Sequence, residues 1–225
     1  YDAIQRKGTE EQKAEVAEGK SSIKKVYTKI QKAERLEKNK ATEWPKGKYR
    51  VIYADPPWQY GDERSGGNHG GAVDHYNTMG INELKNMPIV SLAEDNAVLF
   101  LWATAPLLPE ALELINAWGF KYKTCGFAWM KSGKETNVPI MGTGYWTRAN
   151  TEVCLLATKG KPKRISAGVA QAIYEPRREH SRKPDCINDR IERLVNGPYL
   201  ELFARRERPG WDVWGNQTTK FNEAA

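Results

Sequence analysis

The 225-residue sequence contains little cysteine and little histidine, with three residues of each type. Cys125, Cys154 and Cys186 lie far apart and form no Cys-x-x-Cys pair, which argues against a structural zinc site and against a disulfide framework. Long apolar runs are also missing, since no segment approaches the roughly 18 apolar residues of a membrane span. These absences predict a cytoplasmic protein that binds neither a metal ion nor a membrane.

The composition is that of a globular chain with an excess of positive charge. Apolar residues make up 40% of the sequence, which is enough to bury the core of one α/β domain. The net charge is +7, and residues 1–48 contain 13 Lys and Arg against 8 Asp and Glu, while residues 177–208 contain nine Lys and Arg. This asymmetry favours a polyanionic partner such as nucleic acid, although a solvated surface is the commoner reason for a modest positive charge.

The N-terminal region, residues 1–43, is rich in Lys, Glu, Ala and Gln. Ile23, Val26 and Ile30 recur at helical spacing, so the region is predicted to be one charged amphipathic helix. A solvated linker helix is the plainer interpretation of the same pattern. A Pro and a Gly then end the helix, and a compact domain is expected over 44–225.

The compact domain alternates apolar strands with helices. Strands are predicted over 49–54, 96–104, 121–131, 152–160 and 199–206, and helices over 109–118 and 183–197. Strands that alternate with helices predict an α/β fold with a mostly parallel sheet covered by helices on both faces. Two Gly-containing segments, 60–76 and 131–150, are too long to be minimal connectors and are expected to be loops around a site.

Asp55, Pro56, Pro57 and Trp58 directly follow the strand predicted over 49–54. In open α/β sheets ligands bind beyond the carboxyl ends of the strands, so this motif is expected to face a crevice. The Asp55 carboxylate and the Pro56 carbonyl can act as a fixed pair of acceptors, because proline has no competing N–H. Trp58 offers a face for base stacking, which contributes about 1–3 kcal/mol per base.

An acceptor pair beside an aromatic ring suits an exocyclic amino group of a base. Two acceptors that hold both N–H groups would direct the nitrogen lone pair toward an electrophilic methyl group, so that orientation and electrostatics supply most of the rate. The plainer alternative is an ordinary Asp-Pro-Pro turn with a tryptophan packed beneath it. The four residues alone leave both interpretations open.

The wider sequence resembles the MT-A70 family of S-adenosylmethionine-dependent adenine-N6 methyltransferases, in its prokaryotic or phage form. The resemblance covers residues 49–217 in family order and rests on DPPW (55–58), HYNTM (75–79), LFLWAT (99–104), GYWTRANTEVCLLATKG (144–160), HSRKPDCINDRIERL (180–194), ELFAR (201–205) and WGNQ (214–217). It implies a Rossmann-like methyltransferase fold with the permuted motif order of the β-class amino methyltransferases. It departs from other methyltransferases in lacking an FxGxG signature in the last predicted strand.

The resemblance also implies a role for each matching residue. It implies that Asp55 and the Pro56 carbonyl hold the target amine, that Pro57 shapes the turn and that Trp58 contacts the base. The residues implied to bind S-adenosylmethionine are Lys183 at its methionyl carboxylate, Arg205, Asn216 and Gln217 around its ribose, and Phe203 by its adenine. Tyr76, Asn150 and Glu152 are expected to contact the substrate, whereas for Trp102 a core position is at least as plausible.

The resemblance favours DNA as the nucleic-acid partner. Residues 14–36 faintly resemble helices that follow the helix-turn-helix of ParB-like proteins, which some prokaryotic and phage MT-A70 proteins carry upstream. Residues 1–43 would then be the remnant of a DNA-binding module, in a prokaryotic or phage-infected cell. The alternatives are an RNA adenine-N6 methyltransferase and a catalytically silent nucleic-acid-binding subunit, and the chain would pair with a second copy or with a related family subunit.

Overall fold

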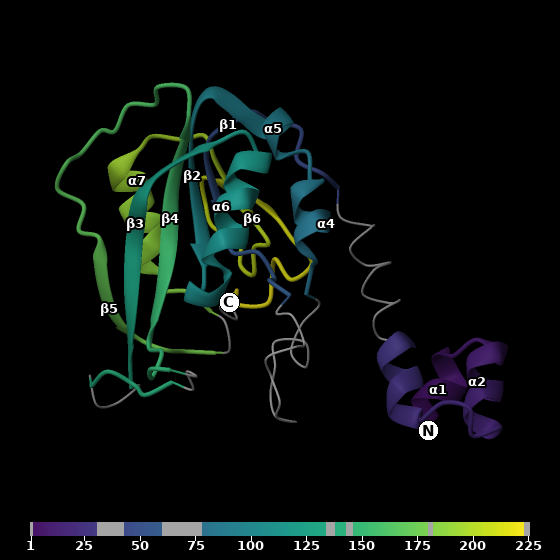
Figure 1. Ribbon diagram of the computed structural model, residues 1–225. Coiled ribbons are helices and arrows are strands. Elements are labelled where there is room, and N and C mark those ends of the chain that lie inside the picture. The colour runs from purple at the N-terminus through teal and green to yellow at the C-terminus, as the bar shows by residue number, and fades with distance from the viewer. Residues whose placement is uncertain are drawn as a thin grey trace. The chain divides into compact units, whose positions relative to one another are not determined.

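The computed structural model describes residues 2–30, 43–59, 78–133, 138–142, 146–179 and 182–222. The chain divides into two compact units, Tyr1–Trp44 and Pro45–Ala225 (Figure 1). Within the stretches described, no helix has the length and apolar composition needed to cross a bilayer.

The N-terminal unit consists of several short helical segments, and the prediction of one helix over residues 1–43 is wrong. Helix α1 spans Asp2–Lys7, α2 spans Glu10–Ala17, and residues 23–30 are helical again. The break before α2 is a capping box, in which the Thr9 hydroxyl accepts from Gln12 N and the Gln12 side chain accepts from Thr9 N. A helix that starts at such a cap cannot continue the preceding one.

The predicted apolar positions in this unit are only partly buried. Val26 and Ile30 form a small cluster with Ile4, as their helical spacing predicts. Ile23, which shares that spacing, is 47% exposed. The unit therefore has a core of its own, but a small one.

The second unit is built on one seven-stranded sheet with the order β5-β3-β4-β2-β1-β6-β7 (Figure 1). The strands are β1 (Tyr49–Ala54), β2 (Ala93–Ala103), β3 (Lys121–Ser132), β4 (Thr151–Lys159), β5 (Ala172–Pro176), β6 (Tyr199–Leu202) and β7 (Trp211–Trp214). All neighbouring pairs are parallel except those of β4, which runs antiparallel to both β2 and β3. The expected α/β fold with a mostly parallel sheet is confirmed.

Helices lie on both faces of the sheet, as predicted. They are α4 (Ile81–Lys85), α5 (Ile89–Leu92), the 3-10 turn η3 (Ala105–Leu107), α6 (Leu108–Ala117) and α7 (Cys186–Leu194). Figure 1 shows α4 and α6 in front of the sheet and α7 behind it. Residues alternate between the two faces along each strand, so that Val51 and Tyr53 of β1 pack in one cluster with Ile187 and Ile191 of α7.

The C-terminal part differs from the prediction in ways that matter for the site. The strand predicted over 199–206 ends at Leu202, because Phe203 has a left-handed backbone (φ 61°) that turns the chain out of the sheet. The strands β5 and β7 were not predicted, and α7 is shorter than the helix expected over 183–197. Gly215 lies against the turn after β6, where a Cβ atom would stand 2.8 Å from the Ala204 carbonyl oxygen.

Candidate active site

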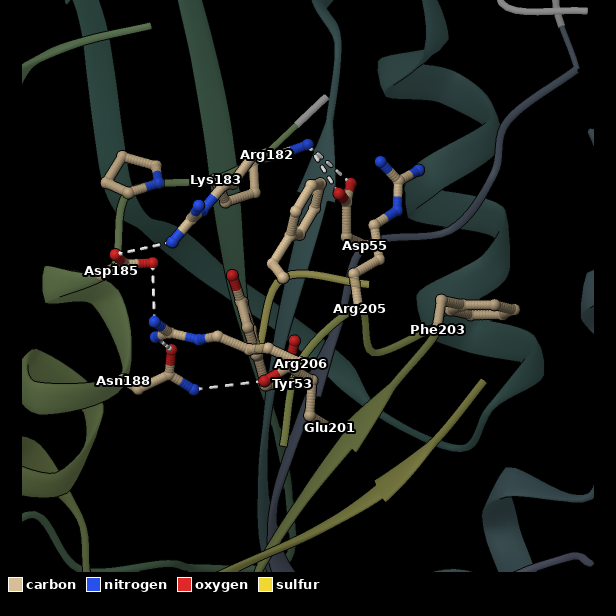
Figure 2. A pocket seen from close by; sticks show the side chains of 12 residues that line it. Tyr53, Asp55, Arg182, Lys183, Asp185, Asn188, Glu201, Phe203, Arg205 and Arg206 are labelled. Atoms are coloured by element: carbon tan, nitrogen blue, oxygen red, sulfur yellow. Dashed lines mark hydrogen bonds and ion pairs between the residues drawn. The ribbon is translucent and has the colours of Figure 1, made fainter. Parts of the chain in front are cut away.

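A cavity opens beyond the carboxyl ends of β1 and β6. These two strands are parallel neighbours, with Ala54 paired to Leu202, so the residues that follow them emerge side by side. The cavity includes about 440 Å³ of empty space, counting the solvent at its mouth. Its lining residues are Tyr53, Asp55, Arg182, Lys183, Pro184, Asp185, Asn188, Glu201, Phe203, Arg205, Arg206 and Phe221 (Figure 2). The crevice expected next to the Asp55 motif is therefore present.

A partly buried charge contact in the cavity joins Asp55 to Lys183. The Lys183 ammonium lies 2.8 and 2.7 Å from the two Asp55 carboxylate oxygens and 3.3 Å from Oε2 of Glu152. Lys131 donates to the other oxygen of Glu152. Lys183 and Glu152 are 11% and 17% exposed, so this chain of alternating charges is largely shielded from water.

Burial and charge act in opposite directions on this chain. Burial disfavours the charged ammonium, but Asp55 and Glu152 outweigh it and raise the pKa of Lys183. Burial likewise favours a neutral Glu152, but Lys183 and Lys131 outweigh it and hold the pKa of this carboxyl well below its usual range. Both groups are therefore charged at neutral pH.

The antiparallel direction of β4 explains how Glu152 reaches the site. Glu152 is the second residue of β4, and its neighbour Val153 pairs with Ala103 at the very end of β2. Because β4 runs against the other strands, its beginning lies at the edge where β1, β2 and β6 end. A parallel β4 would have placed Glu152 at the opposite edge of the sheet.

The Asp-Pro-Pro-Trp segment forms a tight, internally bonded turn. The Pro56 carbonyl accepts from Trp58 N at 2.8 Å, and the Pro57 carbonyl accepts from Met79 N at 2.8 Å. A carbonyl oxygen has two lone pairs, so the Pro56 oxygen keeps one acceptor position. The Trp58 indole donates to the Trp102 carbonyl at 3.0 Å and is only 7% exposed, which leaves no open face for a stacked base in this conformation.

Trp102 is a core residue, which was the expected alternative to a substrate contact. It is 1% exposed, and its indole N–H donates to the Tyr53 hydroxyl at 2.8 Å. The Lys183 ammonium lies 5.4 Å from the centre of the Trp102 ring, within the range of a cation–π contact. Trp102 therefore lies beneath the Asp55–Lys183 pair and supports it.

A second polar cluster, which sequence reasoning missed, forms the other side of the cavity (Figure 2). Arg206 contacts Asp185 at 2.7 Å and donates to the Asn188 side chain at 3.2 Å. Asn188 donates to Glu201 at 3.3 Å, and burial raises the pKa of Glu201 to about 7. A glutamate between the apolar neighbours of a short buried strand was the signal available in the sequence, because such residues are rarely buried without a partner.

Some of the predicted cofactor and substrate residues line the cavity, and others are not among its lining residues. Lys183, Phe203 and Arg205 line the cavity with Asp55, and Glu152 joins them through Lys183. The predicted contacts that are not among the lining residues are Asn150, Asn216 and Gln217. Tyr76 lies outside the described residues.

The architecture and the position of the cavity define an α/β methyltransferase fold, with its site beyond the ends of the parallel strands. The MT-A70 family model matches residues 49–217, and the chain belongs to the MT-A70 family.

Two of its relatives differ in how much of their own length the chain covers. The chain is similar to the type II methyltransferase M.MunI of Mycoplasma sp, with 34% identity over 76% of this chain and 78% of the relative. It is also similar to the human N(6)-adenosine-methyltransferase catalytic subunit METTL3, with 33% identity over 76% of this chain. The matched region is only 28% of METTL3, so this chain corresponds to a limited part of that protein.

Proposed function

We propose that this domain transfers a methyl group from S-adenosylmethionine to the N6 amino group of adenine in DNA. The observation that carries the proposal is the position of Asp55, whose carboxylate lies in the cavity beside the Pro56 carbonyl and is held by Lys183. This arrangement supplies acceptors for an amine at the place where α/β enzymes bind their ligands.

The cavity residues fit the chemical groups of S-adenosylmethionine. We assign Lys183 to the methionyl carboxylate, Phe203 to the adenine side, and Arg205, Asn216 and Gln217 to the ribose. When bound, the donor supplies an electrophilic methyl group.

The residues of the chain orient the acceptor amine and manage its proton. Asp55 and the Pro56 carbonyl accept the two amino N–H groups, which fixes the direction of the nitrogen lone pair. Lys183 donates to both Asp55 oxygens and fixes the carboxylate, which accepts from the amine and can take up the proton lost by the methylated amine. Trp58 and Trp102 hold the turn from below rather than stack on the base.

The relatives favour DNA over RNA as the substrate. The similarity to M.MunI spans 78% of that type II methyltransferase, whereas the similarity to METTL3 spans 28% of a protein named for adenosine methylation. Since the METTL3 identity is nearly as high, RNA remains the second candidate. A silent subunit is disfavoured, because Asp55 and Lys183 are both present and paired.

The positive charge and the N-terminal unit fit the same proposal. A net charge of +7 supports binding to a phosphate backbone. We assign residues 1–43 to a DNA-binding module, and the activity to the cytoplasm of a prokaryotic or phage-infected cell. A second copy or a related family subunit is the proposed protein partner.

The test is transfer of a tritiated methyl group to duplex DNA, single-stranded DNA and RNA, each with and without adenine. We expect incorporation into adenine-containing DNA and its loss in Asp55→Ala, with donor affinity largely retained. Equal turnover by Asp55→Ala would refute the role of this carboxylate. Incorporation into RNA alone would favour the second candidate.

A further inference from the structure

Three arginine side chains share one carboxylate at the side of the cavity where α7 begins. One oxygen of Asp185 lies 2.6 Å from Arg178 and 3.2 Å from Arg182, and the other lies 2.7 Å from Arg206. Figure 2 shows Asp185 between Arg182 and Arg206, and these three residues line the cavity. Arg178, Arg182, Asp185 and Arg206 form what we call the arginine cluster.

The arginine cluster holds more positive than negative charge at contact distance. Within 4.0 Å, the only other carboxylate of the described chain is that of Glu179, which lies 3.3 Å from Arg182 and is 56% exposed. Glu175 acts on Arg178 from beyond this distance. Three cations therefore meet two carboxylates, and Arg182 Nε is buried without a hydrogen-bond partner among the described residues. This excess of donors and positive charge suits an anionic ligand.

Arg178 is the member of the cluster that a ligand can reach most easily. Its side chain is 34% exposed, against 15% for Arg182 and 23% for Arg206. Its one ion pair in the described chain uses Nη1, so further N–H donors of the planar guanidinium remain for a bidentate contact. If Arg178 turned to a ligand, Asp185 would keep Arg182 and Arg206 and would not be left unpaired.

The position of the cluster indicates which anion it would meet. Arg182 directly precedes Lys183, whose ammonium contacts the Asp55 carboxylate. Asp55 is 22% exposed and Asp185 is 38% exposed, so the cluster lies in a more open part of the same cavity. A nucleotide whose amino group reaches Asp55 enters base first, which leaves its phosphate groups on the open side.

We propose that Arg178, held by Asp185 beside Arg182, binds a phosphate group next to the target adenine. This inference rests on the proposed function, because it takes an adenine within a nucleic acid as the substrate. Phosphate contacts fix the position of a nucleic acid without reading its sequence. The contact therefore holds the target nucleotide in the cavity while its amino group meets Asp55.

The first measurement compares the kinetics of Arg178→Gln and the wild type on the adenine-containing DNA of the tritium assay. The KM for this DNA should rise about tenfold, the usual effect of losing a hydrogen bond to a charged group. Since the contact is made before and during the reaction, kcat should stay unchanged, as should the Kd for S-adenosylmethionine. Arg193→Gln removes the same charge from an exposed position in the last turn of α7 and should leave the KM unchanged.

The second measurement places a methylphosphonate, which carries no charge, on either side of the target adenine. In the wild type, one of these two replacements should raise the KM about tenfold. The same replacement should have no further effect on Arg178→Gln, because the variant has already lost the contact. Arg193→Gln should respond to it as the wild type does.

The outcomes separate this inference from the function on which it rests. A wild-type KM that neither methylphosphonate changes would overturn the inference, whatever the variants do. An equal response of Arg178→Gln and the wild type to the neutral linkage would overturn it too. A rise in the Kd for S-adenosylmethionine in Arg178→Gln, with the KM for DNA unchanged, would assign the cluster to the donor instead. Each of these results leaves methyl transfer to adenine in place, whereas transfer to no nucleic acid would overturn the proposed function itself.

Discussion

Replacement of Lys183 by methionine removes the cation from a largely shielded charge network. Lys183 lies 2.7 Å from Asp55 and 3.3 Å from Glu152, and its side chain is 11% exposed. Breaking a buried pair by removing one partner typically costs about 3–5 kcal/mol. Since Glu152 keeps Lys131 as a second partner, we expect Lys183→Met to lower the free energy of unfolding by about 3 kcal/mol, the lower end of this range.

The assays are chemical and thermal denaturation, each followed by tryptophan fluorescence. Seven of the eight tryptophans lie beyond position 44, so the signal reports mainly on the unit that carries the site. For a unit of this size, a loss of about 3 kcal/mol should lower Tm by about 6–12 °C. The control is Lys85→Met, because the Lys85–Glu113 pair is exposed and should contribute less than about 1 kcal/mol.

The pH dependence gives a second measure of the same network. In the wild type, the pKa of Glu152 is held below its usual range, so its stabilising contribution is present near neutral pH and is lost in acid. Removal of Lys183 takes away one of the two cations that lower this pKa, so the difference between variant and wild type should shrink as the pH falls from about 4.5 toward 2. If Lys183→Met and Lys85→Met lost the same unfolding free energy at every pH, the reasoning would be refuted.

Two further substitutions test how the turns at the site are held. Trp58→Phe should cost about 1–3 kcal/mol in the same denaturation assay, because it leaves the buried Trp102 carbonyl without its donor; an unchanged unfolding free energy would contradict this. Gly215→Ala should raise the Kd for the donor at least tenfold by calorimetry, because its Cβ would stand 2.8 Å from the Ala204 oxygen. Gly168→Ala meets nothing closer than 3.8 Å and is the control, so equal effects of the two glycine substitutions would contradict the steric argument.

The sheet and the position of Asp55 were predictable because they depend on local patterns. A run such as 49–54, apolar on both faces, is typical of a central strand in a covered sheet. Asp55 follows this strand directly, and the strand-end rule for α/β folds then gives the crevice. The N-terminal region was wrongly predicted to be one helix because its composition favours helix throughout. The capping box at Thr9, which starts a new helix, is not visible in that composition.

The contacts that arrange the charges depend on pairings distant in sequence. Lys183 and Asp55 are 128 positions apart, and no local pattern specifies that they meet. The position of Glu152 required the direction of β4, and an apolar strand looks the same whether it runs parallel or antiparallel. Conversely, Trp58 follows the strand end as predicted, but its orientation is set by one hydrogen bond to Trp102.

The turn after β6 contains a left-handed residue in a segment that lacks an FxGxG glycine signature. Phe203 adopts φ 61°, a conformation that costs a side chain about 1–2 kcal/mol. Contacts from β7 and the residues after it hold it there: Ala204 N donates to the Trp214 carbonyl at 3.0 Å, and the rings of Phe203 and Trp214 meet edge to face at 5.7 Å. Gly215 then permits the close backbone approach that these contacts require. Gly215, which directly follows β7, thus lies beside the turn, and the aromatic side chain of Phe203 lines the cavity.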